Sequence, residues 1–346
     1  MKDKTVVVAM SGGVDSSVVA LLLKKQGYNV IGLHMSNGID DENDFIKICS
    51  QLDIKYYIEK YDDQMQVVKD YFITSYKNGE TPNPCVVCNK EVKFKPFLDF
   101  TNKIGADYLA TGHYAQIIKD NGKVFLCKAK DDLKDQTYFL NQLNQNQLKK
   151  VLFPLGNLTK EEIRNIAKQN NFANAQKKDS FDVCFIGGQK FKDYMEQNYP
   201  DKIGNIINAD TGKIVGKHTG LSKFTVGQRK GLGIGGQKDI LGKWFVLKKD
   251  INSNILYVST DEQKLMNKSL VAKNVNWINP VDKKTFTCHA KIRYRQQDQK
   301  VLVNINDDGT VLVEFEAPQR AIALGQYVVF YDNNICLGGA EIDKVL

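Results

Sequence analysis

Thr5–Ser17, with the sequence TVVVAMSGGVDSS, is the stretch that decides the fold. Thr5–Met10 is a short run of apolar and β-branched residues, which is the composition of a buried strand. Ser11-Gly12-Gly13 then permits a tight turn, because glycine accepts positive φ and lets the backbone approach a ligand closely. Val14–Gln26 follows as a predicted helix with an apolar side. The stretch therefore predicts a strand, a glycine turn and the N-terminus of a helix.

The same turn has the features of a phosphate site, because free N–H groups and the positive end of a helix dipole attract anions there. It is not a Walker A loop, since no lysine follows Gly13, and it lacks the Rossmann G-x-G-x-x-G pattern. SGGVDSS looks instead like the pyrophosphate loop of enzymes that split ATP into AMP and pyrophosphate. In that interpretation Ser11, Ser16, Ser17 and the turn amides hold the leaving pyrophosphate. Asp15 is suited to Mg²⁺, directly or through water. The alternative is a strand–helix turn that binds nothing.

Length and composition indicate a globular protein of more than one domain. The 346 residues are too many for one average core, and 42% hydrophobic with 25% charged residues is ordinary. No apolar run approaches the length of a membrane span, and no signal peptide precedes the first strand, so we expect a cytoplasmic protein. The seven scattered cysteines argue against a disulfide framework. The net charge of +8 is compatible with a polyanionic partner but does not require one.

Strands and helices alternate through the first part of the chain. After Val14–Gln26 the predicted order is strand, helix, strand, helix, at Val30–His34, Phe45–Leu52, Lys55–Ile58 and Gln64–Tyr76. This alternation predicts a parallel, doubly wound sheet with its ligand site at the carboxyl ends of the strands. Met35, directly after the second strand, could pack against adenine or simply belong to the core.

Thr81–Lys90, TPNPCVVCNK, combines two prolines with two cysteines three residues apart. The prolines predict an extended loop, after which Cys85 and Cys88 open a basic helix to about Ile104. A thiol near a helix N-terminus with lysines nearby should have a lowered pKa. Cys-x-x-Cys alone could be a redox pair, half of a metal site or incidental. The lack of a second such pair disfavours a structural zinc ribbon.

Four later segments add local structure to the first part of the chain. Tyr108–Thr111 is a further strand, and it ends in Gly112-His113, which points to the same crevice. Ala115–Lys128 predicts a hairpin turned at Asp-Asn-Gly. Thr159–Glu162 is a capping box that starts a helix. Cys184 lies in a short apolar run and by itself would be interpreted as a buried, inert cysteine.

The pattern changes after residue 200. Gly204–Gly242 is rich in glycine and lysine and predicts a small domain of turns and short strands. From Ser269 onward, short alternating strands predict a small antiparallel barrel or sandwich. We therefore expect domains at 1–200, 201–268 and 269–346. Lys291–Gln296, KIRYRQ, alternates cations with apolar residues, which would place Lys291, Arg293 and Arg295 on one strand face, a plausible surface for an RNA backbone.

Several of these segments together resemble one family, the bacterial tRNA-specific 2-thiouridylases (MnmA/TrmU family). The matching stretches, in the family's order, are AMSGGVDSS, TPNPCVVCNKEVKF, ATGHYA, KDQTYFL, KKDSFDVCFIG, FTVGQRKGLGI and KIRYRQ. Many enzymes share the pyrophosphate loop, whereas TPNP-x-x-x-CNKE with a distant CFIG is far more specific. The resemblance implies a pyrophosphate-loop ATPase domain of the adenine nucleotide alpha-hydrolase type, a central tRNA-binding domain and a C-terminal β-barrel.

The resemblance also implies an activity: ATP-dependent 2-thiolation of the wobble uridine in the tRNAs for Lys, Glu and Gln, with release of AMP and pyrophosphate. ATP would be bound by Ala9, Met10, Ser11, Gly12, Gly13, Val14, Asp15, Ser16, Met35 and Gly112. The anticodon loop would contact Asn83, Pro84, Cys85, His113, Lys134, Asp135, Gln136, Arg293, Tyr294 and Gln326. Cys184 would carry a persulfide received from a cysteine desulfurase or sulfur-relay protein. Cys88 would be its partner thiol, and the two would end as a disulfide.

The sequence departs from the best-known branch of the family at Cys85, where an acid is often found. Cys85, Cys88 and Cys184 could together hold a [4Fe–4S] cluster with one open iron. We favour the persulfide route, which needs only two of them. Two other hypotheses stay open. One is a different pyrophosphate-loop enzyme, such as an amidotransferase or a cytidine thiolase. The other is a non-catalytic RNA-binding protein with a redox-sensitive cysteine pair. The amidotransferase is disfavoured because an N-terminal catalytic cysteine is absent.

Overall fold

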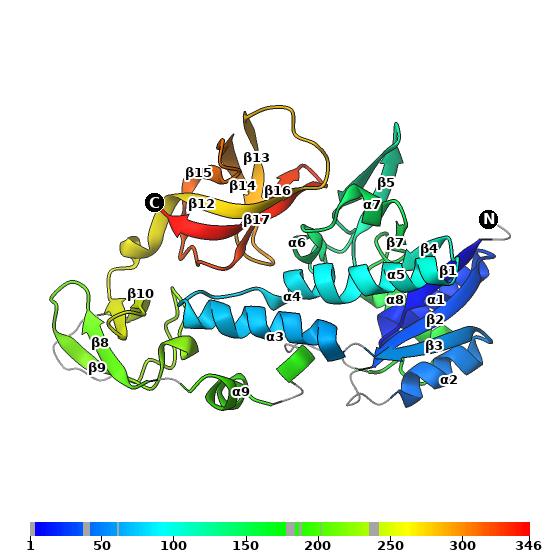
Figure 1. The fold of residues 1–346 in the computed structure, drawn as a ribbon, viewed down its shortest axis with the longest axis horizontal. Helices are drawn as coiled ribbons and strands as arrows, with labels where there is room; N and C mark the ends of the chain where they lie inside the picture. The colour runs from blue at the N-terminus through cyan, green and yellow to red at the C-terminus, as the bar shows by residue number, and fades with distance from the viewer. Residues whose placement is uncertain are drawn as a thin grey trace.

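The computed structural model describes residues 4–36, 42–60, 62–177, 184–186, 189–200, 202–234 and 242–346, with the backbone alone at residues 62, 63, 184 and 192. The chain forms a parallel sheet, a small central sheet and a larger antiparallel sheet. Figure 1 shows the parallel sheet at one end of the molecule, the small sheet at the other, and the antiparallel barrel above the helices between them. None of the described helices is both long and apolar enough to cross a membrane.

The parallel sheet has the order β3-β2-β1-β4-β7. Its strands are β1 Thr5–Ala9, β2 Asn29–Ser36, β3 Lys55–Lys60, β4 Tyr108–Ala110 and β7 Val151–Leu152. Side chains alternate along β1, so Val6 and Val8 face one layer of helices while Val7 faces the other. The predicted doubly wound sheet is therefore confirmed.

Some helices cover both faces of this sheet, and others lie between it and the small central sheet, below the barrel (Figure 1). They are α1 Val14–Lys25, α2 Asn43–Gln51, α3 Asp62–Lys77, α4 Pro84–Val87, α5 Lys95–Lys103, α6 Thr137–Leu140, α7 Gln145–Leu148, α8 Lys160–Gln169 and α9 Phe191–Asn198. A π-helical segment, Cys88–Phe94, joins α4 to α5, and short 3₁₀ turns lie at Cys184–Ile186, Leu221–Lys223 and Glu262–Leu265.

The helix after the two prolines begins earlier than the sequence predicted. α4 starts at Pro84, so the expected extended loop through this residue was wrong. Proline is tolerated at the first position of a helix because its missing N–H would have no intrahelical acceptor there. Cys85 and Cys88 consequently lie within a helical run that continues through the π-helical segment into α5.

The C-terminal strands close into the predicted antiparallel barrel. They are β12 Met266–Trp277, β13 Thr285–Lys291, β14 Gln299–Ile305, β15 Val311–Arg320, β16 Tyr327–Asp332 and β17 Ile335–Val345. Pairing of β12 with β17 closes the barrel. The predicted hairpin, β5 Gln116–Asp120 and β6 Lys123–Cys127, extends the same sheet, because β6 pairs with β17. A hairpin of the α/β part thus becomes an edge of the C-terminal sheet.

The central part is a four-stranded sheet with the order β10-β11-β8-β9. Its strands are β8 Gly204–Asn208, β9 Ile214–His218, β10 Phe245–Asp250 and β11 Ile255–Ser259. It contacts the segment that follows α3, where Lys249 Nζ donates to the carbonyl oxygen of Glu80 at 3.3 Å. The limits 1–200, 201–268 and 269–346 stay predictions.

The segment 291–296 does not form the single strand that its alternation predicted. β13 ends at Lys291, and Arg295 has φ of 64°, in a turn. Arg293 turns inward and donates to the carbonyl oxygen of Ala321 at 2.5 Å. The three cations therefore do not share one strand face.

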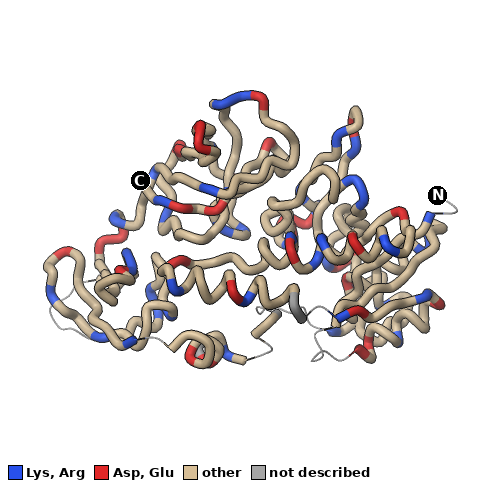
Figure 2. Tube along the Cα trace, viewed as in Figure 1, with Lys and Arg blue, Asp and Glu red and all other residues tan. Residues whose placement is uncertain are grey.

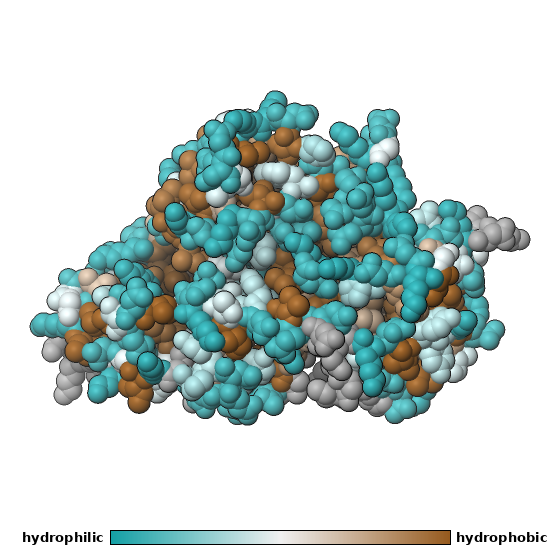
Figure 3. Space-filling view, viewed as in Figure 1, coloured by the Kyte–Doolittle hydropathy of each residue, from teal (hydrophilic) through white to brown (hydrophobic). Residues whose placement is uncertain are grey.

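Charge is distributed along the whole chain. In Figure 2, Lys and Arg occur in all three parts and alternate with Asp and Glu. Figure 3 shows apolar side chains on this face in small groups between hydrophilic ones. The net charge of +8 is therefore not concentrated in one stretch.

Gly338 is the tightest point in the closure of the barrel. Its φ is 136°, and a Cβ there would lie 1.9 Å from the carbonyl oxygen of Asn276 on β12. We expect Gly338→Ala to lower the free energy of unfolding by about 3 kcal/mol, because the two strands must separate. Gly309→Ala is the matched control, with φ of 81° and nothing within 4 Å, and should cost about 1 kcal/mol. Equal losses in denaturant titrations of the two variants would contradict this role.

Candidate active site at the tip of β4

The glycine turn after β1 presents an uncapped helix N-terminus. Gly12 has φ of 70°, and Gly13 is the N-cap of α1 without a side-chain cap. The hydroxyls of Ser16 and Ser17 both donate to the Gly13 carbonyl oxygen, at 3.2 and 2.9 Å. Because the first-turn amides of a helix have no intrahelical acceptor, the turn can accept an anion on its N–H groups.

The tip of β4 lies directly against this helix. A Cβ on Gly112 would be 3.2 Å from the Ser16 amide nitrogen and 3.3 Å from the Cβ of Asp15, so a larger residue would displace the first turn of α1. Two residues later, the Tyr114 hydroxyl donates to Asp15 Oδ1 at 2.9 Å. The glycine turn and the strand tip thus form one unit.

Asp15 is also held by a lysine that is not among the predicted site residues. Lys160 Nζ lies 2.7 and 2.8 Å from the two carboxylate oxygens of Asp15. The two side chains are 13% and 29% exposed, respectively, so the pair is largely shielded from water. The signal available in the sequence was a lysine at the first position of a capped helix, where cations are disfavoured.

Two buried polar atoms beside the turn have no hydrogen-bond partner in the described part of the chain. Asn174 Nδ2 donates to the Gly12 carbonyl oxygen and to Ser17 Oγ, both at 3.0 Å, and its Oδ1 is unpaired. His34 Nδ1 donates to the Met10 carbonyl oxygen at 2.8 Å, and its Nε2 is unpaired. Buried polar atoms are normally satisfied, so both mark places where a ligand could complete the bonding.

Met35, the predicted adenine contact, is partly buried and packs against the hydrophobic cluster that includes Val7 and Leu33. Its side chain therefore contributes to the core at the end of β2. A contact with adenine stays a prediction.

His113 links the strand tip to the helix that carries the cysteines. Its Nδ1 accepts from the Thr111 hydroxyl at 2.8 Å, and its Nε2–H donates to Asn89 Oδ1 at 3.2 Å, a tautomer assigned from these partners. The ring packs against Phe94 and Phe153. Burial, with a smaller contribution from the nearby Lys93, lowers the pKa of His113 well below 6.5. The imidazole is therefore neutral near pH 7.

The cysteines predicted to act on sulfur differ in exposure. Cys85 is exposed in the first turn of α4, whereas Cys88 is 5% exposed. Cys88 belongs to a small apolar cluster against which Phe185 packs. Phe185 directly follows Cys184, whose backbone begins the 3₁₀ turn and whose side chain lies outside the described residues. The chain next to Cys184 thus reaches the surroundings of Cys88.

Residues expected to contact tRNA line the junction between the barrel and the α/β part. Gln326 Nε2 donates to the Thr81 carbonyl oxygen at 2.7 Å, next to the TPNP motif. Tyr294 packs on Phe139, with ring centres 4.5 Å apart, and Asn89 Nδ2 donates to the Phe139 carbonyl oxygen at 3.1 Å. The structure therefore brings these barrel residues close to the cysteine helix and His113.

The motif Lys134-Asp135-Gln136 contacts the residues that follow β4 from inside the protein. Asp135 is buried and accepts from the Ala129 amide at 3.0 Å and from the Thr137 hydroxyl at 2.7 Å. Burial raises the pKa of Asp135 above its usual value. Gln136 Oε1 accepts from the Tyr114 amide at 3.0 Å. Contacts of Lys134, Asp135 and Gln136 with tRNA stay predictions.

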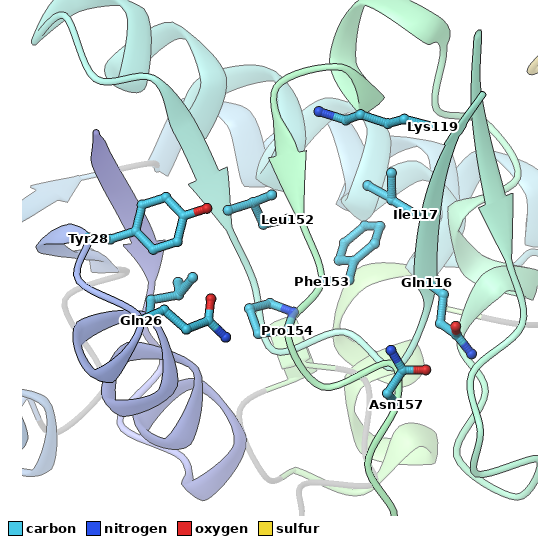
Figure 4. A pocket seen from close by; sticks show the side chains of 10 residues that line it. Gln26, Tyr28, Gln116, Ile117, Lys119, Leu152, Phe153, Pro154 and Asn157 are labelled. Atoms are coloured by element: carbon cyan, nitrogen blue, oxygen red, sulfur yellow. The ribbon is translucent and has the colours of Figure 1, made fainter. Parts of the chain in front are cut away.

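A separate cavity of about 420 Å³ lies between α1 and the β5–β6 hairpin, and Figure 4 shows the side chains around it. Its lining includes Tyr28, Gln116 and Phe153, and it contains none of the predicted site residues. Within the described part of the chain, no group of three or more His, Cys, Asp or Glu residues could hold a metal ion.

Comparisons with known proteins agree with this three-part arrangement. Family models match residues 4–188 ("tRNA methyl transferase HUP domain"), 192–260 ("tRNA methyl transferase PRC-barrel domain") and 267–342 ("Aminomethyltransferase beta-barrel domain"). The tRNA-specific 2-thiouridylase MnmA of Oceanobacillus iheyensis is 50% identical, over 100% of this chain and 96% of the relative. The chain belongs to the tRNA-specific 2-thiouridylase family. Relatives of the same description from Geobacillus kaustophilus and Alkaliphilus oremlandii are 48% and 49% identical, over 100% of this chain and 97% and 98% of their own lengths.

The assignment to the 2-thiouridylase family confirms the resemblance drawn from the seven motifs. The HUP match covers the strand tip and the glycine turn, as expected for a pyrophosphate-loop domain. Sequence reasoning did not select Lys160, Tyr114, Asn89 or Asn174 as site residues. Tyr114 and Asn89 stand within two of the quoted motifs, but their partners Asp15 and His113 belong to other segments of the chain.

The neutral His113 makes a testable contribution to stability. Its folded pKa lies below the 6.5 of the unfolded chain, so protonation of the unfolded state destabilises the protein as pH falls through and below 6.5. As the pH is lowered from about 7 to about 5, the free energy of unfolding of the natural protein should fall. We expect this fall to be steeper than in His113→Asn by up to ~1.4 kcal/mol per pH unit. Equal slopes in urea titrations of the two proteins would show that His113 titrates alike in both states.

Proposed function

We propose that this chain is a tRNA-uridine 2-sulfurtransferase that uses ATP to replace the C2 oxygen of the wobble uridine with sulfur. The tRNAs for Lys, Glu and Gln are the expected substrates. One observation carries the proposal: the tripeptide Gly112-His113-Tyr114, just after β4, contacts both the glycine turn and the helix that carries the cysteines. Tyr114 donates to Asp15 in the nucleotide turn, and His113 donates to Asn89 on the cysteine helix. A nucleotide and a sulfur-bearing thiol would then meet at one strand tip.

The first step needs ATP because the uridine C2 carbonyl is a poor electrophile and its oxygen a poor leaving group. The C2 oxygen attacks the α-phosphate, which forms an O-adenylate and releases pyrophosphate. The first-turn amides of α1 would stabilise the charge that develops on the leaving pyrophosphate. The target base must be turned out of the anticodon loop to reach the site, which single-stranded RNA permits.

The second step transfers sulfur from a persulfide on Cys184. Its terminal sulfur attacks C2, the C–O bond breaks and AMP leaves. The Cys88 thiolate then attacks the Cys184 sulfur, so that the terminal sulfur stays on the base while the two thiols become a disulfide. Two electrons pass from the thiols to the transferred sulfur, and an external thiol reductant must reset the pair. The packing of Phe185 beside Cys88 supports this assignment.

The alternative sulfur route uses a [4Fe–4S] cluster on Cys85, Cys88 and Cys184. Cys85 and Cys88 are three residues apart in one helical run, a spacing that puts both thiols on one side. Cys88, however, packs within an apolar cluster, and the persulfide route needs only this buried thiol and Cys184. Iron and acid-labile sulfide in stoichiometric amounts in anaerobically purified protein would favour the cluster.

Mg²⁺ was expected at Asp15, and the surroundings of this residue do not fit direct coordination. Both carboxylate oxygens accept from the Lys160 ammonium, and one also accepts from Tyr114. A directly bound Mg²⁺ would need one of these oxygens at about 2.1 Å and would be repelled by the ammonium. A contact through water stays compatible with this arrangement, and no step here depends on the metal.

The expected partners are the anticodon loop of tRNA and a sulfur donor of the cysteine desulfurase or relay class. The aromatic pair of Tyr294 and Phe139, together with Arg295 over the Tyr294 ring at 5.2 Å, offers stacking surfaces for unpaired bases. Such a protein would act in the cytoplasm.

Replacement of the sulfur carrier tests the proposal. We expect Cys184→Ser to reduce 2-thiouridine formation by at least about 1,000-fold, because the nucleophile is lost, while tRNA-dependent pyrophosphate release persists for one turnover. Cys88→Ser should also block the reaction when sulfur comes from a persulfide donor. The measurement is mass analysis of nucleosides from tRNA incubated with protein, ATP, Mg²⁺ and a persulfide-loaded donor.

Cys288→Ser is the matched control, because this thiol is buried in the barrel and burial raises its pKa to about 12. It should retain full thiolation. Retained thiolation in Cys184→Ser would refute the sulfur route. No pyrophosphate release by the natural protein would instead favour a non-catalytic RNA-binding role.

A further inference from the structure

Lys160 is placed at the nucleotide turn by the start of α8. Thr159 Oγ1 accepts from the Glu162 amide at 3.2 Å, and Glu162 Oε2 accepts from the Thr159 amide at 2.6 Å, which completes a capping box. The Lys160 amide donates to Asp131 Oδ2 at 3.0 Å. These bonds fix the backbone from which the lysine side chain extends to Asp15.

A lysine is an unfavourable residue for this position of α8. The positive end of the helix dipole repels a cation in the first turn, and α8 gains nothing from this charge. The Lys160 side chain is also only 13% exposed, so its charge is partly desolvated, which is costly without a partner. Its position is better explained by what it does at the N-terminus of α1.

The charges around the turn explain why a cation is needed there. Asp15 lies in the first turn of α1, next to the amides that would bind a polyphosphate. Its negative charge would repel that polyanion unless a cation neutralises it. Lys160 supplies this charge at 2.7 and 2.8 Å, and the Tyr114 hydroxyl holds the same carboxylate from another side at 2.9 Å.

We propose that Lys160 binds the β- and γ-phosphates of the nucleotide, with Asp15 and Tyr114 as positioning residues that hold its ammonium beside the glycine turn. This inference rests on the proposed function, because it assumes that the turn binds a nucleoside triphosphate. An ammonium is a compact charge with rotatable donors on a flexible stem, so it can keep its contact with Asp15 while it donates to a phosphate oxygen, without a backbone shift. The same contact stabilises pyrophosphate as it leaves.

A purely structural pair that clamps α8 to α1 is the competing explanation. Both explanations predict some loss of thermal stability when Lys160 is replaced. They differ in ligand selectivity. A phosphate-binding lysine affects ATP and pyrophosphate but not AMP, whereas a clamp affects all three alike or none.

Calorimetric titration of the full chain with ATP, pyrophosphate and AMP separates the two. We expect Lys160→Gln to weaken binding of ATP and pyrophosphate by about 10- to 100-fold, the value of a charge-assisted hydrogen bond. AMP binding should change by less than about 2-fold, within the scatter of surface substitutions. Lys160→Arg, which keeps the charge, should recover part of the affinity and guards against misfolding of the Gln variant. Tyr114→Phe should shift the ratio of the AMP and ATP dissociation constants by about 3-fold.

Lys130→Gln is the matched control, because Lys130 pairs with Glu162 at the same helix start but is 51% exposed. It should leave all three affinities unchanged. Equal ATP affinity in the natural protein, Lys160→Gln and Lys160→Arg would overturn the inference. A loss of ATP affinity in Lys160→Gln that appears in EDTA and is fully restored by Mg²⁺ would also overturn the inference, because the metal would then supply the positive charge. If the natural protein itself binds no ATP, the proposed function fails rather than this assignment.

Discussion

The close contact between Gly112 and the first turn of α1 is the constraint on which the rest of the site depends. A Cβ at this position would lie 3.2 Å from the Ser16 amide nitrogen, so the tip of β4 and the nucleotide turn touch without an intervening side chain. The next two residues therefore start from fixed points. His113 extends to Asn89 on the cysteine helix and Tyr114 to Asp15, so one strand end connects the two steps of the proposed chemistry.

The barrel is attached to this site through buried polar contacts. The Tyr138 hydroxyl donates to the Tyr327 carbonyl oxygen at 2.8 Å, and Asn276 Nδ2 donates to the Asn141 carbonyl oxygen at 2.8 Å. Breaking such bonds leaves buried groups unpaired, which is costly. Pairing of β6 with β17 adds backbone bonds between the same parts. The barrel can therefore present Tyr294 beside α6 as part of one rigid support.

Sequence reasoning succeeded where local signals agree with the tertiary structure. The alternation of strands and helices, the Asp-Asn-Gly hairpin and the Thr159 capping box all formed as expected. It failed at Pro84, because a proline can begin a helix as well as prevent one. It failed again at 291–296, where alternation suggested a strand but Arg295 adopts a left-handed turn. The inward bond of Arg293 to Ala321 depends on a loop elsewhere in the barrel.

The sequence by itself determined the strand–turn–helix start, the doubly wound sheet, the C-terminal barrel and the family, because these follow from local patterns and specific motifs. Only the tertiary structure decided which residues meet at the site. Lys160 reaches Asp15 across 145 positions of sequence, and Tyr114 reaches it across 99. Such contacts depend on the packing of α8 and β4 against α1. A local residue pattern does not identify a partner so distant in the chain.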